Sequence, residues 1–337
     1  MTTSEQQKLD QTTPYADLTP DLILDAIDQT GFSTSGSLLA LNSYENRVYQ
    51  VGLLDGSFLV AKFYRPGRWS DVTIQEEHDF ALELAEQEIP VVAPLADTTG
   101  HTLRHYQGYR FALYPRRGGR SPELDDPEHL RWLGRMLGRM HNVGSIHPFQ
   151  HRPTLNIQTF GQDAVAFVLE QGFVPPELSH NYRQACEVLL EQITTSFELV
   201  GPYRRLRLHG DCHPGNILWT EAGPHFVDLD DCINGPAVQD LWMLLSGERH
   251  EMERQMGDII EGYRQFCDFD TGELQLIEPL RTLRMLHHAA WLARRWEDPA
   301  FPAAFPWFDS PRYWEDLILS LREQLSAMQE PAIALPI

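Results

Sequence analysis

Two carboxylates and an amide, spaced along one stretch of the chain, are of the types that ATP-dependent phosphoryl transfer requires. The segment HGDCHPGN (209–216) contains Asp211 and Asn216, and Asp228 follows after a short gap. In kinase catalytic loops an Asp accepts the proton of the acceptor hydroxyl, an Asn five positions on holds a metal ion, and a later Asp holds the metal again. Each residue alone is a weak signal. Their order and spacing together predict phosphoryl transfer.

Asp211 is expected to orient and deprotonate the acceptor hydroxyl, with positioning contributing more than basicity. It precedes Pro214-Gly215, whose restricted backbone can hold the carboxylate toward a cleft. Asn216 and Asp228 supply oxygen donors, which Mg²⁺ prefers, so Asp228 counts as both a catalytic and a metal-binding residue. An ordinary Asp/Asn turn would explain Asp211 alone, but Asp228 at the end of an apolar strand favours the chemical interpretation.

Lys62 is the candidate for contacting the phosphates of the nucleotide. It lies in an alternating, strand-like segment, and the helix predicted after it carries Glu76 and Glu77. Kinases pair such a strand lysine with a helix glutamate. We assign Glu77 as the partner, while the pattern leaves Glu76 open. An ordinary surface lysine is the alternative, and the order of strand, lysine and helix favours the nucleotide site.

The nucleotide loop is the weakest part of the pattern. Protein kinases carry GxGxxG there, whereas this chain has LNSYENRVY (41–49) without a glycine. Ser43 could offer its hydroxyl and backbone N–H groups to a phosphate, but an ordinary hairpin turn fits the residues equally well. The adenine is expected against the stretch from Phe111 to Pro115, which includes Tyr114.

Other acidic and histidine residues near the motif have weaker claims to chemistry. Asp240 either caps the helix that it enters or accepts backbone N–H groups of the catalytic loop. Asp230 and Asp231 are possible further metal ligands, although adjacent loop acids are usually solvated. His209 and His213 are four positions apart, but Pro214 and two glycines rule out the helix that would align them on zinc.

The length of 337 residues suggests two lobes. We expect a flexible tail at 1–18, a small nucleotide-binding α/β lobe at 19–114, a hinge at 115–122 and a larger, mainly helical catalytic lobe at 123–330. The hinge is indicated by the turn-rich sequence PRRGGRSP. The predicted fold class is therefore α+β, with a two-lobed, protein-kinase-like arrangement.

Alternating residues predict strands at 47–51, 57–64 and 109–114. A short helix is expected after Thr19-Pro20, and another from about 72 to 87 with Asp71 as its cap. Beyond the hinge, apolar residues recur at helical spacing. Short strands interrupt those helices around the motif, at 205–208, 217–219 and 225–228.

Composition and charge indicate which partners and which cellular compartment to expect. The formal net charge is -21 with a pI near 5.0, which disfavours nucleic-acid and anionic-membrane partners. The four cysteines form no CxxC pair, the N-terminal stretch is polar and without a secretory apolar region, and no apolar run is long enough for a membrane span. We expect a cytoplasmic protein with reduced thiols.

Longer strings carry a family resemblance. LGRMLGRMH (133–141), HGDCHPGNIL (209–218) and FVDLD (226–230) resemble the aminoglycoside-phosphotransferase-like kinase superfamily. Within it the chain is most similar to the bacterial stress response kinase A family, through LNSYENRVYQ (41–50), KFYRP (62–66), GPAVQDLWMLL (235–245) and DPAFP (298–302).

The resemblance implies a cytoplasmic serine/threonine protein kinase that autophosphorylates and acts in stress survival. It implies ATP and Mg²⁺, with Asp211 as proton acceptor, Asn216 and Asp228 on the metal, and Ser43 at the ATP site. The absent glycine loop is then no objection, because the family itself uses the Asn-Ser-Tyr-Glu-Asn string there. We expect a monomer that acts on protein Ser/Thr.

Two alternatives remain open. A small-molecule kinase of the same fold, acting on an aminoglycoside, choline or a sugar, would use the same motif residues, and the acidic composition would suit a cationic substrate. A nucleotide-binding pseudokinase or scaffold is the second alternative. Retention of Lys62, Asp211, Asn216 and Asp228 together argues against it.

Overall fold

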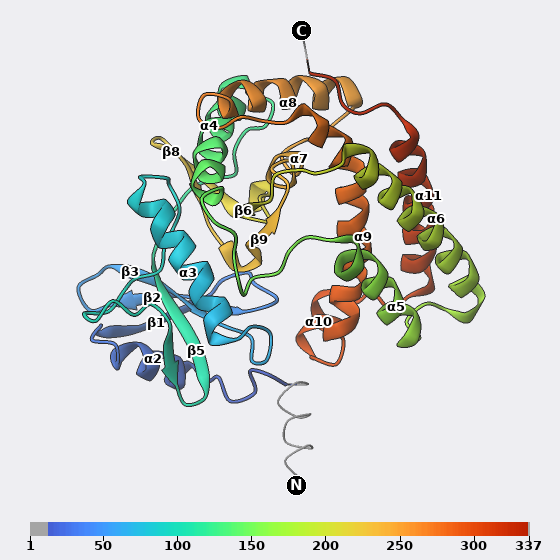
Figure 1. Cartoon of the computed structure of the whole chain (residues 1–337). Helices are drawn as coiled ribbons and strands as arrows, with labels where there is room; N and C mark the ends of the chain where they lie inside the picture. The colour runs from blue at the N-terminus through green and yellow to red at the C-terminus, as the bar shows by residue number, and fades with distance from the viewer. Residues whose placement is uncertain (1–12, 336–337) are drawn as a thin grey trace. The chain divides into compact units, whose positions relative to one another are not determined.

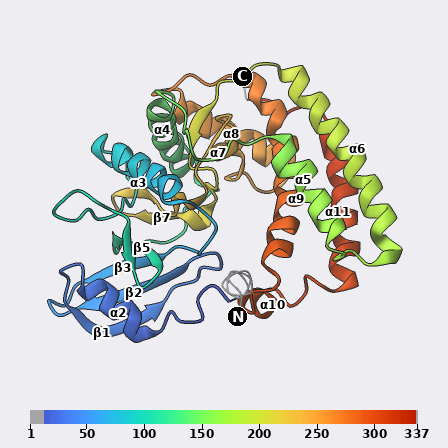
Figure 2. The ribbon, with the colours of Figure 1, turned by 60° about the horizontal axis from the view of Figure 1, so that its bottom comes forward.

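The computed structural model describes residues 13–335, which divide into two compact units (Figures 1 and 2). The first unit contains residues 13–122 together with Gln150–Arg152 and Gly215–Asp230. The second unit contains Glu123–Phe149, Pro153–Pro214 and residues 231–335. No helix in the described part of the chain is long and apolar enough to cross a membrane.

The first unit is built on a five-stranded antiparallel sheet with the order β1-β2-β3-β5-β4. Its strands are β1 (Thr34–Ala40), β2 (Arg47–Leu53), β3 (Phe58–Phe63), β4 (Arg104–Tyr106) and β5 (Tyr109–Pro115). Side chains alternate between the two faces. Leu59, Ala61 and Phe63 of β3 belong to one buried cluster with helix α2 (Pro20–Asp28), so Val60 and Lys62 point to the opposite face.

Helices α2 and α3 of the first unit both begin at side-chain caps. Thr19 caps α2, accepting the Leu22 N–H at 3.3 Å, as the Thr-Pro signal predicts. Helix α3 (Asp71–Glu86) is capped by Ser70, which accepts the Thr73 N–H at 3.3 Å. The prediction that Asp71 is the cap is wrong. Its carboxylate instead binds Arg110 at 3.1 Å, one residue into the helix.

Residues 13–18 do not form a tail, whereas residues 1–12 of the predicted tail lie outside the described part. Tyr15 donates its hydroxyl to the Glu45 carbonyl at 3.1 Å and stacks on Tyr109. Leu18 is buried in the same cluster as α2. The polar composition of the preceding stretch gave no sign of this anchor.

A hairpin from late in the chain belongs to the first unit. Strands β7 (Ile217–Thr220) and β8 (Gly223–Phe226) pair antiparallel. Phe226 donates its N–H to the Pro90 carbonyl at 2.8 Å and accepts the Val92 N–H at 2.9 Å. These backbone bonds join the hairpin to the segment after α3, although its position in the sequence suggests the larger lobe.

The second unit is mainly helical, with one short antiparallel pair of strands, β6 (Leu206–Leu208) and β9 (Ile233–Gly235). Its elements are α4 (Pro127–Gly144), η1 (Gln158–Gln162), α5 (Asp163–Glu170), α6 (Pro176–Val200), α7 (Gln239–Trp242), α8 (Arg249–Tyr263), η4 (Thr271–Leu276), α9 (Ile277–Arg295), α10 (Ala300–Ala304) and α11 (Pro311–Gln329). Helices α5, α6, α9 and α11 share one apolar core that includes Trp314 and Tyr182.

Helices α4 and α8 approach closely through glycine. A β carbon on Gly138 would lie 2.5 Å from the Tyr263 carbonyl oxygen, and one on Gly134 would clash with the Ile259 carbonyl. On α8, Gly262 meets the backbone of α4 in the same way. Only glycine allows the two backbones to pack at this distance, so the repeated glycines of LGRMLGRMH have a packing role.

Candidate active site

A cavity of about 370 Å³ opens in the first unit, within the range of ligand pockets. Six residues singled out from the sequence all line it: Ser43, Lys62, Glu77, Tyr114, Asn216 and Asp228. They come from the β1–β2 connection, the sheet, α3 and the segment around the β7–β8 hairpin. The cavity therefore collects residues that are up to 185 positions apart in the chain.

Strand alternation explains why the sheet contributes Lys62 and Tyr114. Val60 pairs with Tyr114, and Lys62 pairs with Val48 and Ala112. Residues directly opposite one another share a face. Val48, Val60, Lys62 and Tyr114 thus lie on the cavity side of the sheet, where the valine side chains form an apolar part of the cavity wall.

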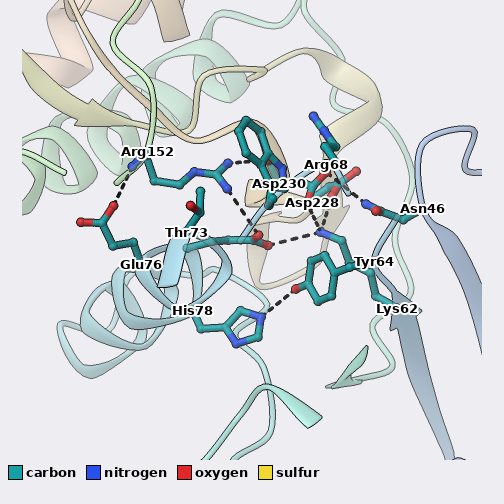
Figure 3. Close-up of polar contacts among 12 residues, drawn as sticks. Asn46, Lys62, Tyr64, Arg68, Thr73, Glu76, His78, Arg152, Asp228 and Asp230 are labelled. Carbon is teal, nitrogen blue, oxygen red and sulfur yellow. Dashed lines mark hydrogen bonds and ion pairs between the residues drawn. The ribbon is translucent and has the colours of Figure 1, made fainter. Parts of the chain in front are cut away.

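The ammonium group of Lys62 is surrounded by three carboxylates, and Figure 3 labels two of them, Asp228 and Asp230. Its Nζ lies 3.2 Å from Glu77 Oε1, 3.1 Å from Asp228 Oδ1 and 3.3 Å from Asp230 Oδ1. Burial alone would lower the pKa of Lys62, but the carboxylates outweigh it and hold that pKa well above the ordinary value. Lys62 is therefore charged at neutral pH.

The adjacent acids of α3 have different partners. Glu77 pairs with Lys62, and burial raises the pKa of its carboxyl group. Glu76 instead accepts three backbone N–H groups, from Gln150 at 2.6 Å and from His151 and Arg152 at 2.7 Å each. The structure thus resolves the choice that the sequence left open, and it adds an anchor for residues 150–152.

Asp228 and Asn216 have side-chain oxygens suited to bind a hard cation such as Mg²⁺. Asp228 has a left-handed backbone, with φ of 59°, and its side chain is 53% exposed, in contrast to the buried Glu77. Asn216 ends a short turn, η2 (Pro214–Asn216), and its carbonyl accepts the Val227 N–H at 3.0 Å. Both line the cavity, so an amide and a carboxylate oxygen are available there for Mg²⁺.

A chain of hydrogen bonds runs behind the cavity wall. The Tyr114 hydroxyl lies 3.0 Å from the Tyr64 hydroxyl, which lies 2.7 Å from His78 Nε2. His78 Nδ1 is 2.7 Å from Thr102 Oγ1. Burial lowers the pKa of His78 to about 3, so its ring is neutral and can accept a hydrogen bond from one hydroxyl. No sequence motif indicated this series of hydrogen bonds.

In the second unit, Asp211 contacts an arginine and a histidine. Arg284 Nη1, on α9, donates to Asp211 Oδ1 at 2.5 Å, and His213 Nε2 lies 3.5 Å from Oδ2. Burial raises the pKa of Asp211, but Arg284 and His213 outweigh it and the net shift is downward. The carboxylate is ionised at neutral pH. Arg284 looks like an ordinary helix arginine in the sequence, so no pattern identified it.

Asp240 fixes the backbone ahead of Asp211. Its carboxylate accepts the N–H groups of His209 and Gly210, both at 2.8 Å, and lies 3.0 Å from His141 Nε2. Helix α7 begins one residue before it, with Val238 at the cap position, so Asp240 is not a cap. His141 is held in turn by Tyr263, 2.9 Å away. The backbone leading into Asp211 is therefore tied to α4, α7 and α8.

Sequence comparison gives close relatives. A model of the phosphotransferase enzyme family matches residues 37–277. Stress response kinase A of Escherichia coli is 46% identical over 321 residues, which cover 95% of this chain and 97% of that protein. A Salmonella typhimurium protein named serine/threonine protein kinase RdoA is 44% identical over the same share of each chain.

Solved structures share the fold at low sequence identity. An amicoumacin kinase in complex with AMP-PNP, Ca²⁺ and amicoumacin has a TM-score of 0.72 at 16% identity, covering 98% of each chain. A microcompartment-associated aminopropanol kinase has a TM-score of 0.70 at 18% identity, covering 91% of this chain and 98% of its own. A choline kinase from Cryptosporidium parvum reaches 0.60 at 11% identity, covering 92% and 96%.

These structural likenesses confirm the predicted fold class, a kinase-like fold with a small α/β part and a larger helical part. The family match gives the class of enzyme, since its members are phosphotransferases. The close relatives confirm the family that the sequence strings resemble. The chain belongs to the phosphotransferase enzyme family and, within it, to the stress response kinase A family.

Proposed function

We propose that this kinase is an ATP- and Mg²⁺-dependent serine/threonine protein kinase that autophosphorylates and acts in the bacterial stress response. The observation that carries the proposal is the identity of 44–46% over 95% of the chain to relatives named for this role. The cavity chemistry supports the nucleotide half of it, because Lys62, Glu77, Asn216 and Asp228 all line one space.

The cavity residues fit a nucleotide with its metal ion. The aliphatic wall formed by Val48 and Val60 suits the flat adenine, with Tyr114 at the same end of the sheet. Lys62, kept charged by Glu77, would bind the phosphates. Asn216 and Asp228 would hold Mg²⁺, which neutralises phosphate charge when bound. Ser43 would offer its hydroxyl to the phosphates.

In the proposed transfer, Asp211 accepts a hydrogen bond from the acceptor hydroxyl and takes its proton. The acceptor oxygen forms a bond to the γ-phosphorus, the bond from that phosphorus to the β–γ bridging oxygen breaks, and ADP leaves. Because Arg284 keeps the pKa of Asp211 low, the carboxylate is a weak base. Its main contribution is to orient the hydroxyl.

The charges around Asp211 favour an uncharged hydroxyl on a protein over a polycationic small acceptor. Arg284 already occupies one carboxylate oxygen, and its positive charge lowers the pKa of Asp211. An aminoglycoside or choline would bring more positive charge to this point. The acidic composition of the whole chain suits such substrates, but the immediate surroundings of Asp211 do not.

We propose that the sheet with its helices binds the nucleotide, that residues 115–122 act as a hinge, and that the helical part from residue 123 carries the acceptor. Residues 215–230 would supply metal ligands to the nucleotide side, in keeping with their grouping in the first unit. A cytoplasmic location and a monomeric state are proposed from the sequence.

The test is incubation with γ-labelled ATP, with and without Mg²⁺, followed by acid hydrolysis of the protein. We expect Mg²⁺-dependent label on phosphoserine or phosphothreonine. Asp228→Ala should raise the Mg²⁺ concentration needed for half-maximal labelling by tenfold or more, since it removes the charged metal ligand. A wild-type protein that takes up no label, or takes up the same label without Mg²⁺, would exclude the proposal.

A further inference from the structure

Asp230, two residues after Asp228, is a buried carboxylate at the meeting point of four segments of the first unit (Figure 3). Its side chain is 5% exposed. Oδ1 lies 3.3 Å from Lys62 Nζ, and Oδ2 accepts from Asn46 Nδ2 at 3.0 Å and from the Arg68 guanidinium. Its backbone carbonyl accepts from Arg152. Loop acids of this kind are usually solvated, and this one is not.

The contact with Asn46 ties down the connection between β1 and β2, residues 41–46. The other end of the Asn46 amide, Oδ1, accepts the Arg65 N–H at 3.1 Å. Both ends of the side chain are therefore engaged, and Asn46 is 3% exposed. Because Leu41, Asn42 and Ser43 line the cavity, fixing Asn46 fixes the C-terminal end of the segment that forms the cavity edge.

The three acids that contact Lys62 differ in exposure. Asp228 is half exposed and lines the cavity, whereas Glu77 and Asp230 are buried beside the ammonium group. A buried charge without a partner is costly, so Lys62 needs neighbours that do not leave it. If Asp228 turns toward a metal ion, Glu77 and Asp230 still hold Lys62 in place.

Asp230 is poorly suited to bind the metal itself. Both of its oxygens already face cationic or amide donors, and it is not among the residues that line the cavity. Arg68 pairs with Oδ2, and Arg152 donates to the backbone carbonyl. A divalent cation would have to displace these groups, while Asn216 and the half-exposed Asp228 line the cavity itself.

We propose that Asp230 is a positioning residue for nucleotide binding, which holds the Lys62 ammonium group and the Asn46 end of residues 41–46 and does not bind the metal. This proposal rests on the proposed function, since it assumes that the cavity takes ATP.

The test compares Asp230→Asn with Asp231→Asn, the exposed acid next to it. Affinity for ATP is measured by titration of a fluorescent ATP analogue and competition with ATP, and KM and kcat by labelling. Asp230→Asn should weaken ATP binding and raise KM by about tenfold or more, the usual effect of losing hydrogen bonds to a charged group. The Mg²⁺ concentration for half-maximal activity at saturating ATP should change less than about twofold. Asp231→Asn should leave ATP affinity at the wild-type level.

A double-mutant cycle tests whether Asp230 acts on ATP binding through its contact with Asn46. Asn46→Ala alone should also weaken ATP binding, and the double variant should bind ATP within about twofold of Asp230→Asn, because residues acting through one contact are not additive. If Asp230→Asn does not fold, a folded Asn46→Ala variant with wild-type ATP affinity contradicts the proposal.

Other outcomes separate this role from the proposed function. Unchanged ATP affinity in folded Asp230→Asn, or a shift in Mg²⁺ dependence as large as that of Asp228→Ala, overturns the role of Asp230 alone. A wild-type protein without affinity for ATP overturns both this role and the proposed function.

Discussion

Asp211 shows how neighbouring side chains set the ionisation state of a partly buried acid. Burial raises its pKa, yet the Arg284 guanidinium at 2.5 Å, together with His213, reverses the shift. The carboxylate is therefore ready to accept a hydrogen bond over the whole neutral range. Its backbone is fixed separately, through the two N–H groups that Asp240 accepts.

Replacement of Asp211 by Asn should separate transfer from nucleotide binding. We expect phosphoryl transfer to fall by about 10²–10⁴-fold, the usual contribution of a positioned proton acceptor. ATP affinity should stay within about twofold, because no residue that lines the cavity changes. Single-turnover labelling and nucleotide titration measure the two quantities. Wild-type transfer by the variant would show that Asp211 is not the proton acceptor.

At this scale the motif residues and the Glu77 partner of Lys62 were predictable, whereas the other partners were not. Lys62, Asn216 and Asp228 have spacings that kinase chemistry prescribes, and all three line the cavity. Arg284 and Asp230 act through ion pairs with residues 73 and 168 positions away, and such pairs leave no local pattern. The role of each motif residue stays a prediction until its variant is measured.

At the scale of elements, the contact between α4 and α8 depends on the absence of side chains. Gly138 lies against the Tyr263 backbone, and Tyr263 holds His141, which in turn contacts Asp240. The same helix pair thus packs the second unit and supports the backbone before Asp211.

Gly138→Ala should lower stability, against the usual trend for helices. Alanine in place of a helical glycine normally gains about 0.5–1 kcal/mol. Here the new β carbon would lie 2.5 Å from a carbonyl oxygen, and forcing the helices apart should cost about 1–3 kcal/mol instead. Thermal unfolding measures the difference. Asn142→Ala, at an exposed position of α4, is the control and should change stability by less than about 0.5 kcal/mol. A raised Tm for Gly138→Ala would contradict the packing argument.

Glu273, in η4, should make stability depend on pH. Burial raises the pKa of its carboxyl group from 4.5 to about 7, even though it accepts the Val238 N–H at 3.0 Å. The folded chain therefore keeps this proton to higher pH than the unfolded chain, so stability falls as pH rises from about 4.5 to about 7.

Glu273→Gln should remove that loss, since it cannot ionise and can still accept the N–H. We expect a Tm about 2–4 °C above the wild type at pH 8 and close to it at pH 5. Glu315→Gln, an exposed glutamate of α11, is the control. An equal Tm difference at both pH values would mean that Glu273 does not titrate in this window.

The element boundaries that failed have physical explanations. Strand β1 was missed because its residues Ser-Gly-Ser-Leu-Leu-Ala do not alternate and most are exposed. The cap of α3 was placed one residue late because Ser70 and Asp71 are both good capping residues and only geometry separates them. Strands β2, β3 and β5 alternate clearly and were predicted.

At the scale of the whole molecule, sequence order did not reveal how the chain divides. The hairpin β7–β8 follows the proposed catalytic loop, yet its backbone bonds with Pro90 and Val92 place it with the sheet of the first unit. Such long-range pairing depends on backbone groups that every residue has, so no residue type reports it. The fold class was predictable because helix-rich and strand-rich segments separate along the chain.

The central claim is that the acceptor is a hydroxyl of a protein. A small-molecule hydroxyl would use the same residues of the site. Overall charge and the surroundings of Asp211 point in opposite directions, since the chain carries a formal charge of -21 while Arg284 and His213 flank the carboxylate. Small-molecule kinases with the same fold use hydroxyl acceptors as well, so only the product identifies the substrate class.

The most direct measurement is phosphosite mass spectrometry of the wild type and Asp211→Asn after incubation with MgATP, run beside a panel of aminoglycoside, choline and sugar acceptors. We predict phosphoserine or phosphothreonine on the wild-type chain, none on the variant beyond background, and no turnover of the panel. An unmodified wild-type chain that phosphorylates one of the small alcohols would contradict the protein-kinase account.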